Sequence, residues 1–228
     1  MFKTTADDLP TRLRGRTRIA VTLALAILGL ATFGWVTEPA RAEDPLLPPI
    51  GTCANDINAS TSWSATDPQR MAVDCLINAV RRKAGAHPLR YCAMSGTVCS
   101  LDGVHWALFA QAQIWATGLN IAAQYKSQDV MACAPAADPH NACDRAPSYW
   151  PARNVYPWPV AEILAAGWPT MNPRQAVDWW LHSPEHRRIM LDDRYVTLGV
   201  GVTPGVSQGL MIPKAVSGHV WAAQLGVG

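Results

Sequence analysis

The clearest indication of the fold class is a strand pattern at residues 196–203, Val196-Thr197-Leu198-Gly199-Val200-Gly201-Val202-Thr203. Its apolar residues recur at every second position, which is the period of a β-strand with one buried face, and the two glycines leave the other face smooth. Residues 220–227 have the composition of a partner strand, reached through a Gly/Pro/Ser-rich segment at 204–218. Because helical patterns precede both strands, the sequence predicts an α+β domain with antiparallel strands.

Capping residues and apolar spacing predict the helices upstream of these strands. Asp67 and Pro68 form a helix start, and Gly85 ends the same helix. Further helices are expected at about 102–117, 160–166, 174–181 and 185–190. Residues 126–158 show no usable periodicity, so they are predicted to form a loop-rich insertion.

Residues 1–42 have the three parts of a secretory signal peptide. Four arginines between positions 12 and 18 precede an apolar run at 19–36, and Ala40-Arg41-Ala42 forms a small-x-small cleavage site. The run approaches the roughly 20 residues that cross a bilayer, so an uncleaved anchor is the competing interpretation. With cleavage after Ala42, we expect a mature chain without a membrane span, secreted or in the extracytoplasmic cell envelope.

The remaining chain is expected to be a linker at 43–66 and one domain at 67–228. Six of the 19 Lys/Arg and three of the 17 Asp/Glu lie in residues 1–42, which leaves a net charge of −1 beyond them. No basic cluster there is larger than Arg81-Arg82-Lys83. The mature chain therefore gives no support to a nucleic-acid partner.

All the cysteines lie beyond the leader, at positions 53, 75, 92, 99, 133 and 143. An even number in an exported chain predicts three disulfides, although the spacing leaves many connectivities possible. Sequence proximity suggests Cys92 with Cys99 and Cys133 with Cys143, which leaves Cys53 for Cys75. No C-x-x-C pair occurs, so zinc-ribbon and thioredoxin-type sites are disfavoured.

Two apparent catalytic motifs are rejected. Residues 205–209 match G-x-S-x-G, but Pro213 prevents the helix that a nucleophile elbow needs. Residues 182–186 match H-x-x-E-H, but Pro184 makes Ser183 the cap of a new helix, so the two histidines fall on different elements. His186 then lies in the first turn of a helix, where the helix dipole is expected to lower the pKa of its imidazole.

Six motifs occur in the order found in one known family. They are Leu76-Ile77-Asn78-Ala79-Val80-Arg81-Arg82, Ala112-Gln113-x-Trp115-Ala116, Ala161-Glu162-Ile163-Leu164-Ala165-Ala166-Gly167, Ala176-Val177-Asp178-x-Trp180-x-x-Ser183-Pro184-Glu185-His186-Arg187, Leu198-Gly199-Val200-Gly201-Val202 and Val220-Trp221-Ala222-Ala223-Gln224-Leu225-Gly226. In this order they resemble the CAP superfamily (SCP domain; cysteine-rich secretory proteins, antigen 5 and pathogenesis-related 1 proteins), in its bacterial branch. The resemblance covers about residues 68–227.

The resemblance implies a disulfide-stabilised three-layer α-β-α sandwich with a central antiparallel sheet. It also implies a central cleft lined by two histidines and one or two glutamates, which in some members takes a divalent metal such as zinc. Glu162 and His186 match the glutamate and the second histidine of the family. The first histidine falls near Tyr125 or Lys126, so either a ligand is lost or His140 replaces it; His140 could equally be exposed.

Three functional hypotheses follow. In the first, Glu162, His186 and His140 hold a divalent metal, and the cleft binds a small apolar ligand or lipid. In the second, the protein is a metal-assisted hydrolase, with Glu162 as base and His186 as its catalytic partner. In the third, the cleft is vestigial and the insertion binds an extracellular protein through Tyr149, Trp150, Tyr156 and Trp158. The sequence leaves open whether the protein is an enzyme.

Overall fold

The computed structural model describes residues 42–59, 66–92, 99–100, 110–133, 138–167, 169–206 and 217–227. The signal peptide predicted at 1–42 thus falls almost wholly outside the described residues, as does most of the G-x-S-x-G match at 205–209. Within the described ranges, no helix combines the length and the hydropathy needed to cross a membrane.

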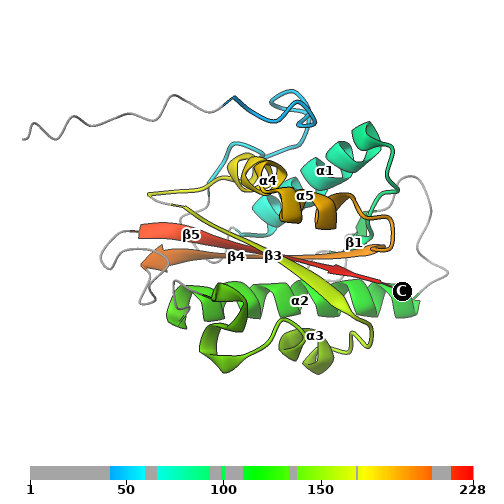
Figure 1. Cartoon of the computed structure of the whole chain (residues 1–228), viewed down its shortest axis with the longest axis vertical. Coiled ribbons are helices and arrows are strands. Elements are labelled where there is room, and N and C mark those ends of the chain that lie inside the picture. The colour runs from blue at the N-terminus through cyan, green and yellow to red at the C-terminus, as the bar shows by residue number, and fades with distance from the viewer. Residues whose placement is uncertain are drawn as a thin grey trace, which may run out of the picture. The chain divides into compact units, whose positions relative to one another are not determined.

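Three layers make up the unit that begins at Ala42 (Figure 1). One outer layer contains α1 (Thr66–Ala84), α4 (Pro173–His182) and α5 (Pro184–Leu191). The central sheet contains β3 (Val160–Gly167), β4 (Thr197–Val206) and β5 (Ser217–Gly226). The other outer layer contains α2 (Ala110–Cys133), the 3-10 helix η3 (Pro139–Asp144) and α3 (Tyr149–Arg153). A short ladder joins β1 (Tyr91–Cys92) to β2 (Cys99–Ser100). The predicted α-β-α sandwich is confirmed.

The sheet has the strand order β3-β5-β4, and both pairings are antiparallel. Because side chains alternate between the faces of a strand, Ile163 and Ala165 enter the core beside α1 and α4, whereas Leu164 packs with Val130 of α2. Glu162 has the same parity as Leu164, and its partner across β5 is Gln224. This register directs the predicted site glutamate toward the layer of α2 and η3.

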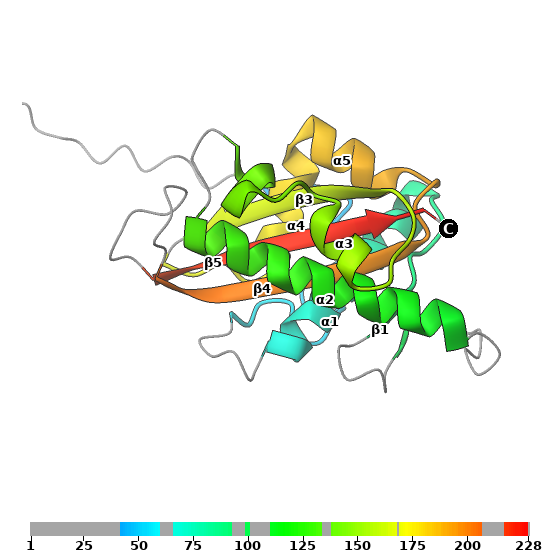
Figure 2. The ribbon, with the colours of Figure 1, turned by 90° about the horizontal axis from the view of Figure 1, so that it is seen from below.

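Helix α2 lies as close to β4 as two backbones permit, and Figure 2 shows it running across the sheet. A Cβ added at Gly201 would meet the backbone oxygen of Ala123 at 2.1 Å, and one at Gly199 would meet that of Leu119 at 2.3 Å. Helix α2 therefore packs on the smooth glycine face that the sequence predicts for this strand. Two side-chain amides of the helix also form hydrogen bonds with the backbone of the strand. In the first of these contacts, Asn120 Oδ1 accepts from Val200 N at 2.8 Å.

Gln124 makes the second such contact one helical turn later. Its Oε1 accepts from Val202 N at 3.1 Å, and its Nε2 donates to Val202 O at 3.0 Å. Asn120 and Gln124 are both buried, so these bonds replace water for polar groups in the core. Helix α2 is thus held to β4 by packing and by hydrogen bonds together.

The prediction of a helix at 160–166 is wrong, because these residues form strand β3. The run from Val160 to Gly167 is buried in its centre on both faces, so it lacks the alternation by which a half-buried strand is recognised. Its alanines favour a helix only weakly, and pairing of all eight residues with β5 overrides that preference.

The second helix extends farther than predicted. Helix α2 continues to Cys133, so the insertion expected at 126–158 begins inside a helix and also contains η3 and α3. Its apolar stripe is interrupted by buried polar residues, which is why spacing alone ended it at about 117. These are Asn120, Gln124, Lys126, Ser127 and Asp129.

Residues 42–59, part of the expected linker, pack against the domain. Leu47 and Cys53 are buried, and Cys53 forms a disulfide with Cys75 of α1. Arg174 of α4 binds both carboxylate oxygens of Glu43 at 2.6 Å. The described segment is thus anchored by one covalent link and by ion pairs.

Two of the suggested disulfides are confirmed, Cys53–Cys75 and Cys133–Cys143. Cys92 is also disulfide-bonded, and its Cα partner across the β1–β2 ladder is Cys99. Each confirmed link joins residues that are close in sequence, with separations of 22 and 10 residues.

Candidate functional site

Glu162 lies in the middle of a buried polar cluster. Its side chain is 1% exposed, and both carboxylate oxygens already have partners. Oε1 lies 3.0 Å from His140 Nδ1 and 3.6 Å from Lys126 Nζ, and Oε2 accepts a hydrogen bond from Gln224 Nε2 at 3.0 Å. The carboxylate therefore binds groups from three separate parts of the chain.

Lys126 is the member of this cluster whose role the sequence did not predict. Its side chain is as buried as that of Glu162, and it projects from the last turns of α2. The ammonium donates to the backbone oxygens of His140 and Arg145, the second at 3.2 Å, and pairs with Glu162. The only signal in the sequence was that the family's first histidine falls at or next to this position.

His140 is brought to Glu162 by a constrained loop. The Cys133–Cys143 disulfide ties the end of α2 to η3, and Cys143 and Asp144 both adopt φ of 57°. Positive φ at two successive residues that are not glycine turns the chain sharply. The His140 ring is 37% exposed, so it joins the cluster from the solvent side.

His186 lies at the start of α5, as predicted. Helix α4 ends at His182, and Ser183 caps α5 by accepting from His186 N at 3.5 Å. The H-x-x-E-H match is thus split between two helices. Burial lowers the pKa of His186 below its usual value, and the nearby charge of His140 lowers it further, whereas Glu185 opposes this effect. The main cause is burial rather than the helix dipole.

The lowered pKa of His186 predicts a stability that falls in acid. The unfolded imidazole takes up a proton below its ordinary pKa of 6.5, but the folded one resists it, so the unfolded state binds more protons and stability falls as pH decreases from 6.5. We expect His186→Gln to reduce this slope in urea titrations between pH 7 and pH 5. His87→Gln is the control, because the His87 side chain is 85% exposed. Equal slopes in all three proteins would contradict the prediction.

The residues of the cluster do not fit a divalent metal. Glu162 has an ammonium ion at one oxygen and an amide at the other, and His140 directs Nδ1 at the carboxylate. Across the described ranges, no group of three or more His, Cys, Asp or Glu side chains is arranged to hold a metal ion. A metal would have to displace contacts that already satisfy the carboxylate.

A separate groove of about 490 Å³ lies between α2 and the residues that follow α3. Its apolar lining includes Ile114 and Ile121 on one face of α2 and Val155 opposite them. Ile114 and Val155 are 49% and 61% exposed. Arg153 supplies a cation at its border and lies over the Tyr149 ring at 3.9 Å. None of Glu162, His140 and His186 lines this groove.

The aromatic residues proposed as anchors have different roles. Tyr156 is buried and donates to Val227 O at 2.8 Å, so it packs the insertion onto the sheet. Trp158 lies edge-on to Trp115 of α2. Tyr149 and Trp150 are half-buried, and Trp150 also donates to Asp129 at 2.7 Å. Among the four, Tyr156 is therefore a structural residue.

The fold and these contacts define a disulfide-stabilised α-β-α domain with a buried cluster of ionisable residues. The profile of the cysteine-rich secretory protein family (CAP) matches residues 108–212, which include Lys126, His140, Glu162 and His186. The match covers 105 of the 228 residues and agrees with the family resemblance of the sequence motifs.

Two solved structures are similar to this chain. One is an extracellular protein containing a SCP domain from Bacillus anthracis, with 15% identity and a TM-score of 0.45 over 70% of this chain; the match spans only 40% of the length of that protein. The other is an outer surface protein from Borrelia burgdorferi, with 11% identity and a TM-score of 0.42, covering 72% of this chain and 96% of that one. The curated proteins include no match to the chain.

Proposed function

We propose that this CAP-domain protein works outside the cytoplasm and binds a small amphiphile, with an apolar chain and an anionic head, in the groove between α2 and α3. The observation that carries this proposal is the groove itself: a volume of about 490 Å³ lies in the range of ligand sites, and its lining combines exposed aliphatic side chains with one arginine. The disulfides support a location where thiols are oxidised.

Arg153 favours an anionic head group over a neutral one. It makes no ion pair within the part of the chain that the structure describes, and its guanidinium lies over the Tyr149 ring. A guanidinium can bind a carboxylate through two parallel hydrogen bonds. An alkyl chain lying along Ile114 and Ile121 would bury their exposed surface, which is favourable by roughly 25 cal/mol per Å².

The buried cluster supports a hydrolase less well. A general base needs an oxygen that can reach a water molecule, but both oxygens of Glu162 are engaged and its side chain is almost fully buried. We therefore assign ligand binding to the groove and a positioning role within the fold to Glu162.

A charge placed in the groove should weaken binding. We expect Ile114→Glu to raise the dissociation constant for a long-chain fatty acid at least about tenfold, which corresponds to about 1.4 kcal/mol, because it brings a carboxylate beside the apolar chain. Displacement of a fluorescent fatty-acid analogue measures the effect. Met71→Glu is the matched control, since Met71 is also an exposed apolar helical residue, on α1.

A second comparison tests the head group. Arg153→Gln should weaken binding of the fatty acid but leave binding of the corresponding fatty alcohol unchanged. If Ile114→Glu and Met71→Glu bind the fatty acid equally well, or if the wild-type protein binds neither probe, the proposed function is wrong.

A further inference from the structure

Lys126 places a fixed positive charge in the part of the fold where the family resemblance implies a metal. We propose that the Lys126 ammonium is the cation of this buried cluster and takes the place of a divalent metal beside Glu162. The inference rests on the buried cluster alone and does not depend on the ligand of the groove.

The Lys126 ammonium has three protein partners where it lies. A lysine side chain has three N–H donors, and Lys126 donates hydrogen bonds to the backbone oxygens of His140 and Arg145 and forms an ion pair with Glu162 at 3.6 Å. With 1% of its side chain exposed, it has no water to exchange for these partners. Lys126 therefore behaves as a structural ion and is not a reactive amine.

The charges of the cluster are already balanced. Lys126 neutralises Glu162, and in the described part of the chain no second carboxylate completes a three-residue ligand group. A divalent cation at Glu162 would lie beside an ammonium ion that cannot move away, and like charges repel strongly where water is excluded.

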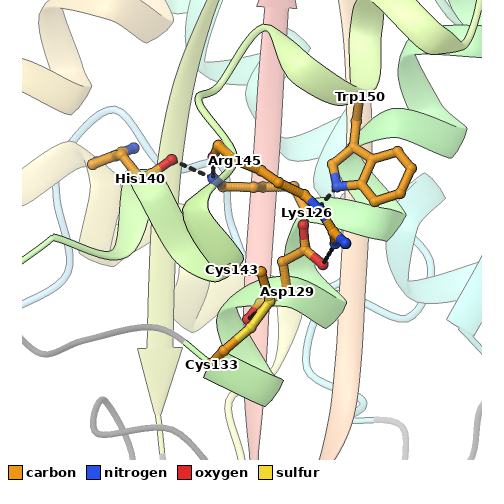
Figure 3. The surroundings of a disulfide bond; sticks show 7 residues. All are labelled: Lys126, Asp129, Cys133, His140, Cys143, Arg145 and Trp150. Carbon is orange, nitrogen blue, oxygen red and sulfur yellow. Dashed lines mark hydrogen bonds and ion pairs between the residues drawn. A yellow bond between two sulfur atoms is a disulfide. The ribbon is translucent and has the colours of Figure 1, made fainter.

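The loop closed by the Cys133–Cys143 disulfide builds the surroundings of this ion (Figure 3). Both backbone oxygens that accept from Lys126 belong to the segment at or just after η3. Asp129, one helical turn beyond Lys126, binds Arg145 Nη1 at 2.6 Å and the indole of Trp150 at 2.7 Å, which fixes the same segment. The cation site is thus built from α2 and from the loop that returns to it.

Calorimetric titration with zinc chloride tests the proposal on residues 43–228 with the disulfides intact and on three variants: Lys126→His, Glu162→Gln and the double variant Lys126→His/Glu162→Gln. We expect the wild-type protein to show no saturable binding up to 100-fold molar excess. Lys126→His removes the ammonium and adds an imidazole beside Glu162, and should gain one zinc site. The double variant should lose at least 90% of that gained affinity, since a carboxylate is a metal ligand and an amide is a poor one.

The titrations distinguish a site where Lys126 replaces the metal from a site that binds zinc in the wild-type protein. Saturable one-to-one zinc binding by the wild-type protein that Glu162→Gln abolishes would overturn the proposal, and this arm needs no change at Lys126. A folded Lys126→His protein that binds no zinc would also overturn it, because the lysine would then not occupy a position suited to a metal. Circular dichroism establishes that each variant is folded before titration.

Discussion

Replacing Lys126 with methionine is expected to lower the free energy of unfolding by about 3–5 kcal/mol. Methionine has a similar length, so the volume changes little, but the Glu162 carboxylate loses its ammonium partner in a place without water. The backbone oxygens of His140 and Arg145 lose a donor at the same time. Urea denaturation followed by circular dichroism measures the change in stability.

The double variant Lys126→Met/Glu162→Gln separates loss of the pair from loss of packing. Removing both charges leaves no buried ion, so we expect the double variant to be less destabilised than the sum of the two single variants by about 1–3 kcal/mol. Lys83→Met is the control, because Lys83 is exposed and its ammonium also bonds to a backbone oxygen, that of Pro45. Additive single variants would show that Lys126 and Glu162 do not interact.

Adding one methyl group at Gly201 should be the second severe change. We expect Gly201→Ala to lower the free energy of unfolding by about 3 kcal/mol, because its Cβ would lie 2.1 Å from the backbone oxygen of Ala123 and backbone cannot rotate out of the way. Either α2 or β4 must move, and the hydrogen bonds between the Gln124 side chain and the Val202 backbone are then stretched. Thermal and urea denaturation both report the loss.

Gly85→Ala provides the comparison. Gly85 ends α1 with φ of 81°, and a Cβ there would have no atom within 4 Å. The cost of alanine at that position is only backbone strain, about 1–2 kcal/mol. If Gly201→Ala is no more destabilising than Gly85→Ala, the close approach of α2 to β4 does not exist in solution.

The strand at 197–206 could be predicted because its two faces have different environments. One face enters the core and the other receives a helix backbone, so valine alternates with glycine and the period of two is visible in the sequence. Strand β3 has no such contrast, since residues between Val160 and Gly167 are buried on both faces. A short apolar run of this kind does not distinguish a strand from a helix.

The candidate site could be predicted only in part. Glu162 and His186 could be proposed because they fall within family motifs, and His140 only because a ligand was missing. The partner of Glu162 is Lys126, and a lysine on a helix normally indicates an exposed face. Only the tertiary structure, which brings α2, η3 and β3 together, makes it a buried ion.

The amide contacts of Asn120 and Gln124 with β4 have a consequence for the behaviour of the protein at high concentration. Strand β4 lies at one edge of the sheet, and the edge of a sheet exposes N–H and C=O groups that can pair with a strand of another molecule. The amides of α2 already occupy the N–H groups of Val200 and Val202 and the oxygen of Val202. Asn120 and Gln124, two buried polar side chains of α2, therefore protect this edge from the addition of a strand from another molecule, which is the first step toward aggregation.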